Sequence, residues 1–115
     1  MTNCIVIVQF PGEKRSEEDA VINGTMTAPT YLSLAAEGLI RKDYLNGDAG
    51  TGGVYLWKTR KSAENWFTTE RKQMLTEKFG IEPKITWYDT HVTVDNLNNE
   101  TRVNGVTQPL IKAAE

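Results

Sequence analysis

A run of charges inside an apolar hairpin constrains this chain more than any other feature. Residues 38–57 have the pattern of two strands joined by a glycine-rich loop. Three consecutive charged residues, Arg41, Lys42 and Asp43, interrupt the first of these strands. A charge inside a sheet is costly unless it is paired or faces a polar group. The hairpin is therefore either a half-solvated ribbon or the wall of a pocket that needs charge.

The segments around the hairpin predict the order strand, helix, strand, strand, helix, strand. We expect strands at 4–10, 38–45, 53–57 and 84–94, and helices at 16–37, interrupted near Gly24 and restarted at Pro29, and at 59–79. This order is that of a ferredoxin-like α+β domain, in which two helices cover one face of a four-stranded antiparallel sheet. The domain is expected to occupy residues 1–96, and the polar segment 97–115 to be a C-terminal arm or loose tail.

The first strand also predicts a partner for the sheet. Its apolar residues are almost continuous between Cys4 and Phe10, which indicates that both faces of the strand are covered. Two helices on one face leave the other face open. The simplest cover is a second copy of the chain, so we expect a two-fold homodimer through the sheet face.

Composition narrows the class of protein. The formal charge of −2 over 115 residues gives no basic surface for nucleic acid. No apolar run reaches the length of a membrane span. Cys4 is the single cysteine, which fits a reducing compartment, so we expect a cytoplasmic protein. One histidine and one cysteine do not make a metal-ligand cluster.

Several motifs resemble one known family. They are Ala28-Pro29-Thr-Tyr31, Gly38-Leu-Ile-Arg-Lys-Asp-Tyr-Leu45, Gly52-Gly-Val-Tyr-Leu-Trp57 and Val94-Asp-Asn96. Together they resemble the YdhR-like small monooxygenase-type proteins of the dimeric α+β barrel superfamily, which includes the antibiotic-biosynthesis monooxygenases. The resemblance covers more than half of the chain. One position departs from the family pattern: His91 stands where the last strand of the family tends to carry a proline.

The resemblance implies a function as well as a fold. It implies a ligand cavity between sheet and helices, and oxygenation of a small aromatic or hydrophobic metabolite with no flavin, metal or other cofactor. Such a reaction needs an apolar slot and groups that stabilise a developing anion. Two alternatives stay open: a non-enzymatic ligand-binding or stress-response dimer, and an isomerase or cyclase that uses acid–base chemistry in the same pocket.

The candidate catalytic residues come from the charged strand and from the end of the last strand. Lys42 or Arg41 would stabilise the anion, Tyr44 would orient it, and His91 would join Asp89 in an acid–base pair or ligate a heme as in heme-degrading relatives. Alternation places Lys42 and Tyr44 on one strand face, and Leu39 and Arg41 on the other. We favour Lys42 toward the cavity, and Arg41 with Asp43 toward the dimer.

Aromatic residues are the candidate substrate-binding groups. They are Tyr31 and Trp66 on the helices and Tyr55, Trp57 and Trp87 on the strands. Each candidate also has a structural interpretation. Trp66 fits the core stripe of its helix, Trp57 and Trp87 fit sheet packing, Lys42 and Tyr44 fit the rim of a cavity, Arg41 fits an ion pair with Asp43, and His91 fits a solvated strand end.

Overall fold

The computed structural model describes residues 1–109, and within them the chain is an α+β fold built on antiparallel sheets. The elements are β1 (Asn3–Pro11), α1 (Glu17–Ser33), the 3₁₀ turn η1 (Leu34–Glu37), β2 (Leu39–Gly47), β3 (Gly50–Trp57), α2 (Arg60–Trp66), α3 (Thr69–Phe79), β4 (Lys84–Thr90), β5 (Val92–Asp95), β6 (Glu100–Val103) and β7 (Val106–Thr107). The four-stranded sheet has the order β2-β3-β1-β4, and every neighbouring pair is antiparallel. The α+β class predicted from the sequence is confirmed.

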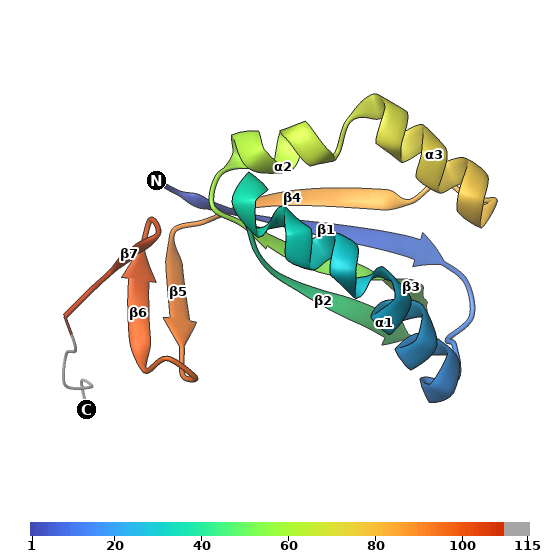
Figure 1. The fold of residues 1–115 in the computed structure, drawn as a ribbon, viewed down its shortest axis with the longest axis horizontal. Coiled ribbons are helices and arrows are strands. Elements are labelled where there is room, and N and C mark those ends of the chain that lie inside the picture. The colour runs from blue at the N-terminus through green and yellow to red at the C-terminus, as the bar shows by residue number, and fades with distance from the viewer. Residues whose placement is uncertain (110–115) are drawn as a thin grey trace.

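The helices lie over the four-stranded sheet, and the smaller sheet lies beside it. Figure 1 shows α1 along β2 and β3, and α2 with α3 along β4, while β5, β6 and β7 stand away from the helices. Their order is β5-β6-β7. None of the helices described here combines the length and the apolar character needed to cross a membrane.

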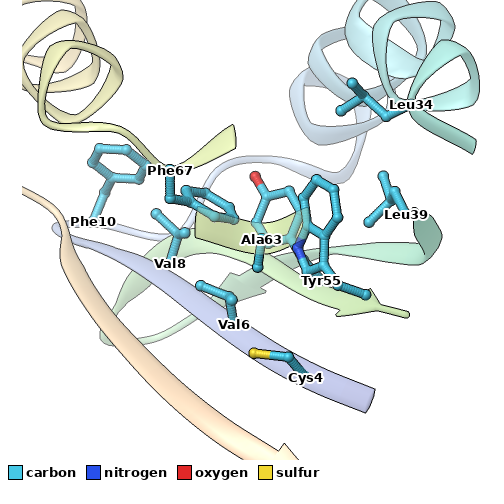
Figure 2. Close-up of a cluster of buried hydrophobic side chains, with 10 residues drawn as sticks. Cys4, Val6, Val8, Phe10, Leu34, Leu39, Tyr55, Ala63 and Phe67 are labelled. Atoms are coloured by element: carbon cyan, nitrogen blue, oxygen red, sulfur yellow. The ribbon is translucent and has the colours of Figure 1, made fainter. Parts of the chain in front are cut away.

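The core forms where one face of β1 meets the helices. Cys4, Val6, Val8 and Phe10 alternate along the strand and are buried, and Figure 2 shows their side chains on one side of β1. The ring of Phe67 packs edge-on into this layer. Within one chain, the buried face of β1 is therefore the face that carries these alternating residues. The almost continuous apolar run of its sequence does not bury both faces of the strand.

The helix ends follow the sequence signals. The Ser16 hydroxyl accepts a hydrogen bond from the Asp19 amide at 3.1 Å, and Gly38 and Gly80 end their helices with φ of 100° and 71°. The expected interruption of the first helix is wrong, because α1 runs through Gly24 and Pro29. A Cβ atom added at Gly24 would lie 3.7 Å from the Tyr44 ring, so α1 passes close to β2 at this weak helix former without a break.

The expected single second helix is also wrong, because it divides into α2 and α3. Phe67 leaves the helical conformation with φ −87° and ψ 62°. Thr68 then caps α3, and its hydroxyl oxygen accepts from the Arg71 amide at 3.2 Å. The break turns the Phe67 ring into the core. Tertiary packing and a new cap here override the apolar period that the sequence carries across 59–79.

The glycine-rich segment is a strand and not a mobile loop. The connection between β2 and β3 is short, and Gly50, Gly52 and Gly53 belong to β3. A Cβ atom added at Gly52 would lie 1.8 Å from the carbonyl oxygen of Val8, and one at Gly50 would lie 2.0 Å from that of Phe10. These glycines therefore allow β3 to approach the backbone of β1 closely.

The last predicted strand and the predicted tail also differ from the structure. β4 ends at Thr90, and β5 belongs to the second sheet, where it pairs with β6. Arg102 on β6 contacts Asp95 at 3.2 Å and also pairs with Glu100. Much of the expected loose tail is thus ordered as a hairpin, and residues 110–115 lie outside the described part of the chain.

Candidate functional site

Two adjoining cavities lie between the sheet and the helices. The first, which we call the Lys42 cavity, has a volume of about 150 Å³ and is lined by β1, α1, β2, β3 and α3. The second, the Arg71 cavity, has a volume of about 580 Å³ and separates α1 from α2 and α3. The residues that line both are Thr27, Tyr31, Tyr55, Leu75 and Lys78. The shared walls make the two cavities one binding region.

The Lys42 ammonium lies among three tyrosine rings. Its Nζ is 3.4 Å from the ring centroid of Tyr31, 3.9 Å from that of Tyr44 and 4.7 Å from that of Tyr55. No carboxylate of residues 1–109 comes within ion-pair distance of this nitrogen. A half-buried cation is thus held by ring faces instead of a counter-ion.

Burial lowers the pKa of Lys42 to about 7. The ring faces favour the ammonium form and oppose this shift. They do not replace the hydrogen bonds that the ammonium loses with water, so the pKa stays below that of a free lysine. Near neutral pH the side chain therefore exists in both the charged and the neutral form.

Two backbone features aim Lys42 at the helices. A bulge at the start of β2 shifts the register between Leu39 and Arg41, so that Leu39 and Lys42 both face the helices. Gly53 has no side chain and so leaves room for the side chain of Lys42, since a Cβ atom at Gly53 would lie 3.0 Å from the Lys42 Cε. The prediction from alternation that Leu39 shares the face of Arg41 is therefore wrong, because the bulge moves Leu39 to the other face.

Two of the tyrosines around Lys42, Tyr44 and Tyr55, keep their hydroxyl protons near neutral pH. The hydroxyl oxygens of Tyr44 and Thr27 are 2.5 Å apart. The carbonyl oxygen of Asn23 lies 3.2 Å from the Thr27 hydroxyl, so Thr27 donates there and accepts from Tyr44. Burial raises the pKa of Tyr44. Burial raises the pKa of Tyr55 further, and the neighbouring Tyr31 adds to the shift.

An arginine stacked on a tryptophan forms one wall of the Arg71 cavity. The guanidinium carbon of Arg71 is 3.4 Å from the Trp66 ring centroid. Its Nε donates to the carbonyl oxygen of Trp66 at 2.8 Å. The Trp66 ring is in turn 6.1 Å from the ring of Tyr31. Tyr31 therefore lines both cavities, Trp66 lines the Arg71 cavity, and their roles in binding a substrate stay predictions.

Arg41 does not share the site with Lys42. It lies on the opposite face of β2 and is exposed, with its Nε 2.8 Å from Asp43 Oδ2 and its Nη2 3.2 Å from Oδ1. Lys42 thus lies toward the cavity, as the sequence favoured, and the dimer contact expected for Arg41 and Asp43 stays a prediction. Arg41 takes the structural alternative of an ion pair with its neighbour.

Three other predicted residues lie outside the two cavities. Trp57 is fully buried at the end of the sheet where the small side chain of Ala63 brings α2 close. Trp87 packs edge-on against Phe67, with ring centroids 5.9 Å apart. His91 is exposed where the chain leaves the main sheet, and its Nδ1 is 2.9 Å from Asn104 Oδ1. The structure does not bring any of them to Lys42.

Two further residues in these walls were not predicted from the sequence. Arg71 follows the helix break at Phe67, which the apolar period of 59–79 does not indicate. Asn46 is held by two backbone hydrogen bonds to Arg15, both 2.9 Å, at the other end of the Lys42 cavity. In the described chain no three His, Cys, Asp or Glu side chains gather as a metal site.

Comparisons of the chain with protein-family models and with curated proteins found no match.

Proposed function

We propose that this protein is a small, cofactor-independent oxygenase that acts on a hydroxylated aromatic metabolite in the Lys42 cavity. The observation that carries the proposal is the half-buried Lys42 amine, which lies over three tyrosine rings and has no ion-pair partner among residues 1–109. Its pKa of about 7 suits a group that must both accept a proton and carry charge near neutral pH.

Proton removal from the substrate is the first step of this proposal. The neutral Lys42 amine takes the phenolic proton and becomes an ammonium ion next to the phenolate. The new charge pair is stabilised because the site excludes much of the water that would screen it. The Tyr31, Tyr44 and Tyr55 rings supply flat apolar surface against which an aromatic substrate packs.

Dioxygen is the oxidant in the second step. The phenolate passes electrons to dioxygen, and a carbon–oxygen bond forms at a ring carbon that bears hydrogen. The oxygen–oxygen bond of the resulting peroxide then breaks. One oxygen atom stays as a quinone carbonyl, and the other leaves as water with the hydrogen lost from carbon and the proton held by Lys42. Each turnover thus consumes one substrate and one dioxygen.

The same proposal extends to the fold and to assembly. The antiparallel order β2-β3-β1-β4 with helices over one face supports a ferredoxin-like domain of the YdhR-like type.

On the face opposite the helices Ile5, Ile7, Val54 and Leu56 are half-buried, and Tyr88 is exposed. This apolar surface supports a homodimer through the sheet. Sedimentation as a stable monomer at micromolar concentration would contradict it.

Oxygen uptake tests the reaction directly. We expect the protein to consume dioxygen with at least one member of a panel of dihydroxybenzenes, naphthols and hydroxyphenyl acids, in a one-to-one ratio with quinone formed. An oxygen electrode and absorption spectra measure the two quantities. Conversion without oxygen uptake would replace the oxygenase by an isomerase or cyclase, and binding without conversion would indicate a ligand-binding protein.

A further inference from the structure

The charge of the two cavities is opposite to that of the whole chain. Their walls carry four cationic side chains, Arg15, Lys42, Arg71 and Lys78, and one carboxylate, Glu77. The chain as a whole has a formal charge of −2. Such a cationic hollow in an acidic protein concentrates anionic ligands.

The guanidinium of Arg71 has hydrogen-bond donors that an anionic ligand in the Arg71 cavity could use. Its guanidinium carbon lies 3.4 Å from the Trp66 ring centroid, and its Nε donates a hydrogen bond to the Trp66 carbonyl oxygen. The two terminal nitrogens have no hydrogen-bond or ion-pair partner among residues 1–109. Two adjacent N–H donors in one plane match the two oxygens of a carboxylate.

The path from Lys42 to Arg71 is lined by aromatic rings. Tyr31 contacts the Lys42 ammonium on one side, and its ring lies 6.1 Å from that of Trp66 on the other. Tyr55 and Leu75 line both cavities. A ligand that spans them therefore needs a flat apolar middle with a polar group at each end.

We propose that the substrate is an aromatic acid whose phenol lies at Lys42 and whose carboxylate lies at Arg71. This inference rests on the proposed function for the role of the phenol, and it adds the carboxylate and the residue that selects it. Arg71 acts in binding and specificity and takes no part in the proton transfer.

Matched ligands test the carboxylate contact. Calorimetric titration compares hydroxybenzoate, hydroxyphenylacetate and 3-(4-hydroxyphenyl)propanoate with their methyl esters. We expect the best acid to bind the wild-type protein about tenfold more tightly than its ester, or better. In Arg71→Gln the acid and the ester should bind almost equally, with the affinity for the ester little changed.

A neighbouring lysine provides the control. Lys72 lies on α3 next to Arg71 but is exposed and does not line either cavity, so Lys72→Gln should keep the preference for the acid. Arg71→Lys, which keeps the charge without the planar fork, should keep part of it. Thermal unfolding of each variant verifies that it is folded.

The outcomes separate this inference from the proposed function. Equal binding of acid and ester by the wild-type protein, an acid preference that survives Arg71→Gln, or no binding of any acid at millimolar concentration would overturn the inference. Selective binding of acids without oxygen uptake would leave the inference standing and refute the oxygenase. Oxygen uptake at equal rates with acids and esters would refute the inference about the carboxylate and leave the oxygenase standing.

Discussion

Replacing Lys42 with methionine is expected to stabilise the protein and to abolish its reaction. Methionine is close to lysine in volume and leaves no charge among the three tyrosine rings. The free energy of unfolding should rise by about 1–2 kcal/mol at pH 6.5, a figure reduced for the solvent that reaches this half-buried side chain. Turnover of a proven substrate should fall by about 10²- to 10⁴-fold, the usual contribution of a general base.

The stability gain of Lys42→Met should depend on pH with a definite sign. The pKa of Lys42 is about 7 in the folded chain and about 10.4 when unfolded. Between these values the unfolded state binds more protons, so wild-type stability rises with pH. The advantage of the variant is therefore greatest at and below pH 7 and shrinks toward pH 10. Urea unfolding of both proteins at pH 6.5 and 9.5 measures it.

Two controls isolate the role of the amine. Lys72→Met removes an exposed lysine on α3 and should change stability little at either pH. Lys42→Arg keeps a cation whose pKa is too high for a base, so it should still bind phenolic anions but not turn them over. A Lys42→Met protein that is less stable than wild type at pH 6.5, or equally active, would refute this account of Lys42.

Replacing Gly52 with alanine should have the largest effect on stability. The added Cβ would lie 1.8 Å from the carbonyl oxygen of Val8 and 3.1 Å from the Cα of Gln9, and the φ of Gly52 is 158°. Backbone atoms cannot move aside as a flexible side chain can, so β1 and β3 must separate. We expect a loss of about 3 kcal/mol or more, or failure to fold, as measured by urea unfolding.

Gly47 provides the matched comparison on the adjacent strand. A Cβ atom there would meet the carbonyl oxygen of Gly50 at 3.7 Å, an ordinary contact. Gly47→Ala should therefore unfold at nearly the wild-type urea concentration. Similar stability of the two alanine variants would show that β3 does not need the close approach to β1 at Gly52.

The sequence predicted the elements of the main sheet better than their details. Alternation along β2 separated Lys42 from Arg41 correctly because strand geometry fixes it. It failed at Leu39, since a bulge depends on the partner strand. The glycines of β3 resembled a loop because composition does not distinguish a flexible turn from a backbone that must approach another strand.

The walls of the site were harder to predict for a similar reason. Tyr31 and Trp66 were found through their aromatic character. Arg71 was missed because its place depends on the helix break after Trp66, which a continuous apolar period conceals. His91 was a candidate because its imidazole was expected to share a strand face with Asp89, but β4 ends at Thr90, and the exposed His91 lines neither cavity.

A titration of Lys42 shows whether its amine is neutral often enough near pH 7 to accept a proton from a substrate. Carbon-13 labelling at the lysine Cε positions, with Lys42→Met to assign the signal, follows this amine by NMR from pH 5 to 12. The account predicts a midpoint near 7, which an acidic aromatic ligand shifts upward by placing an anion next to the ammonium. A midpoint near the free-lysine value of about 10.4 would contradict it.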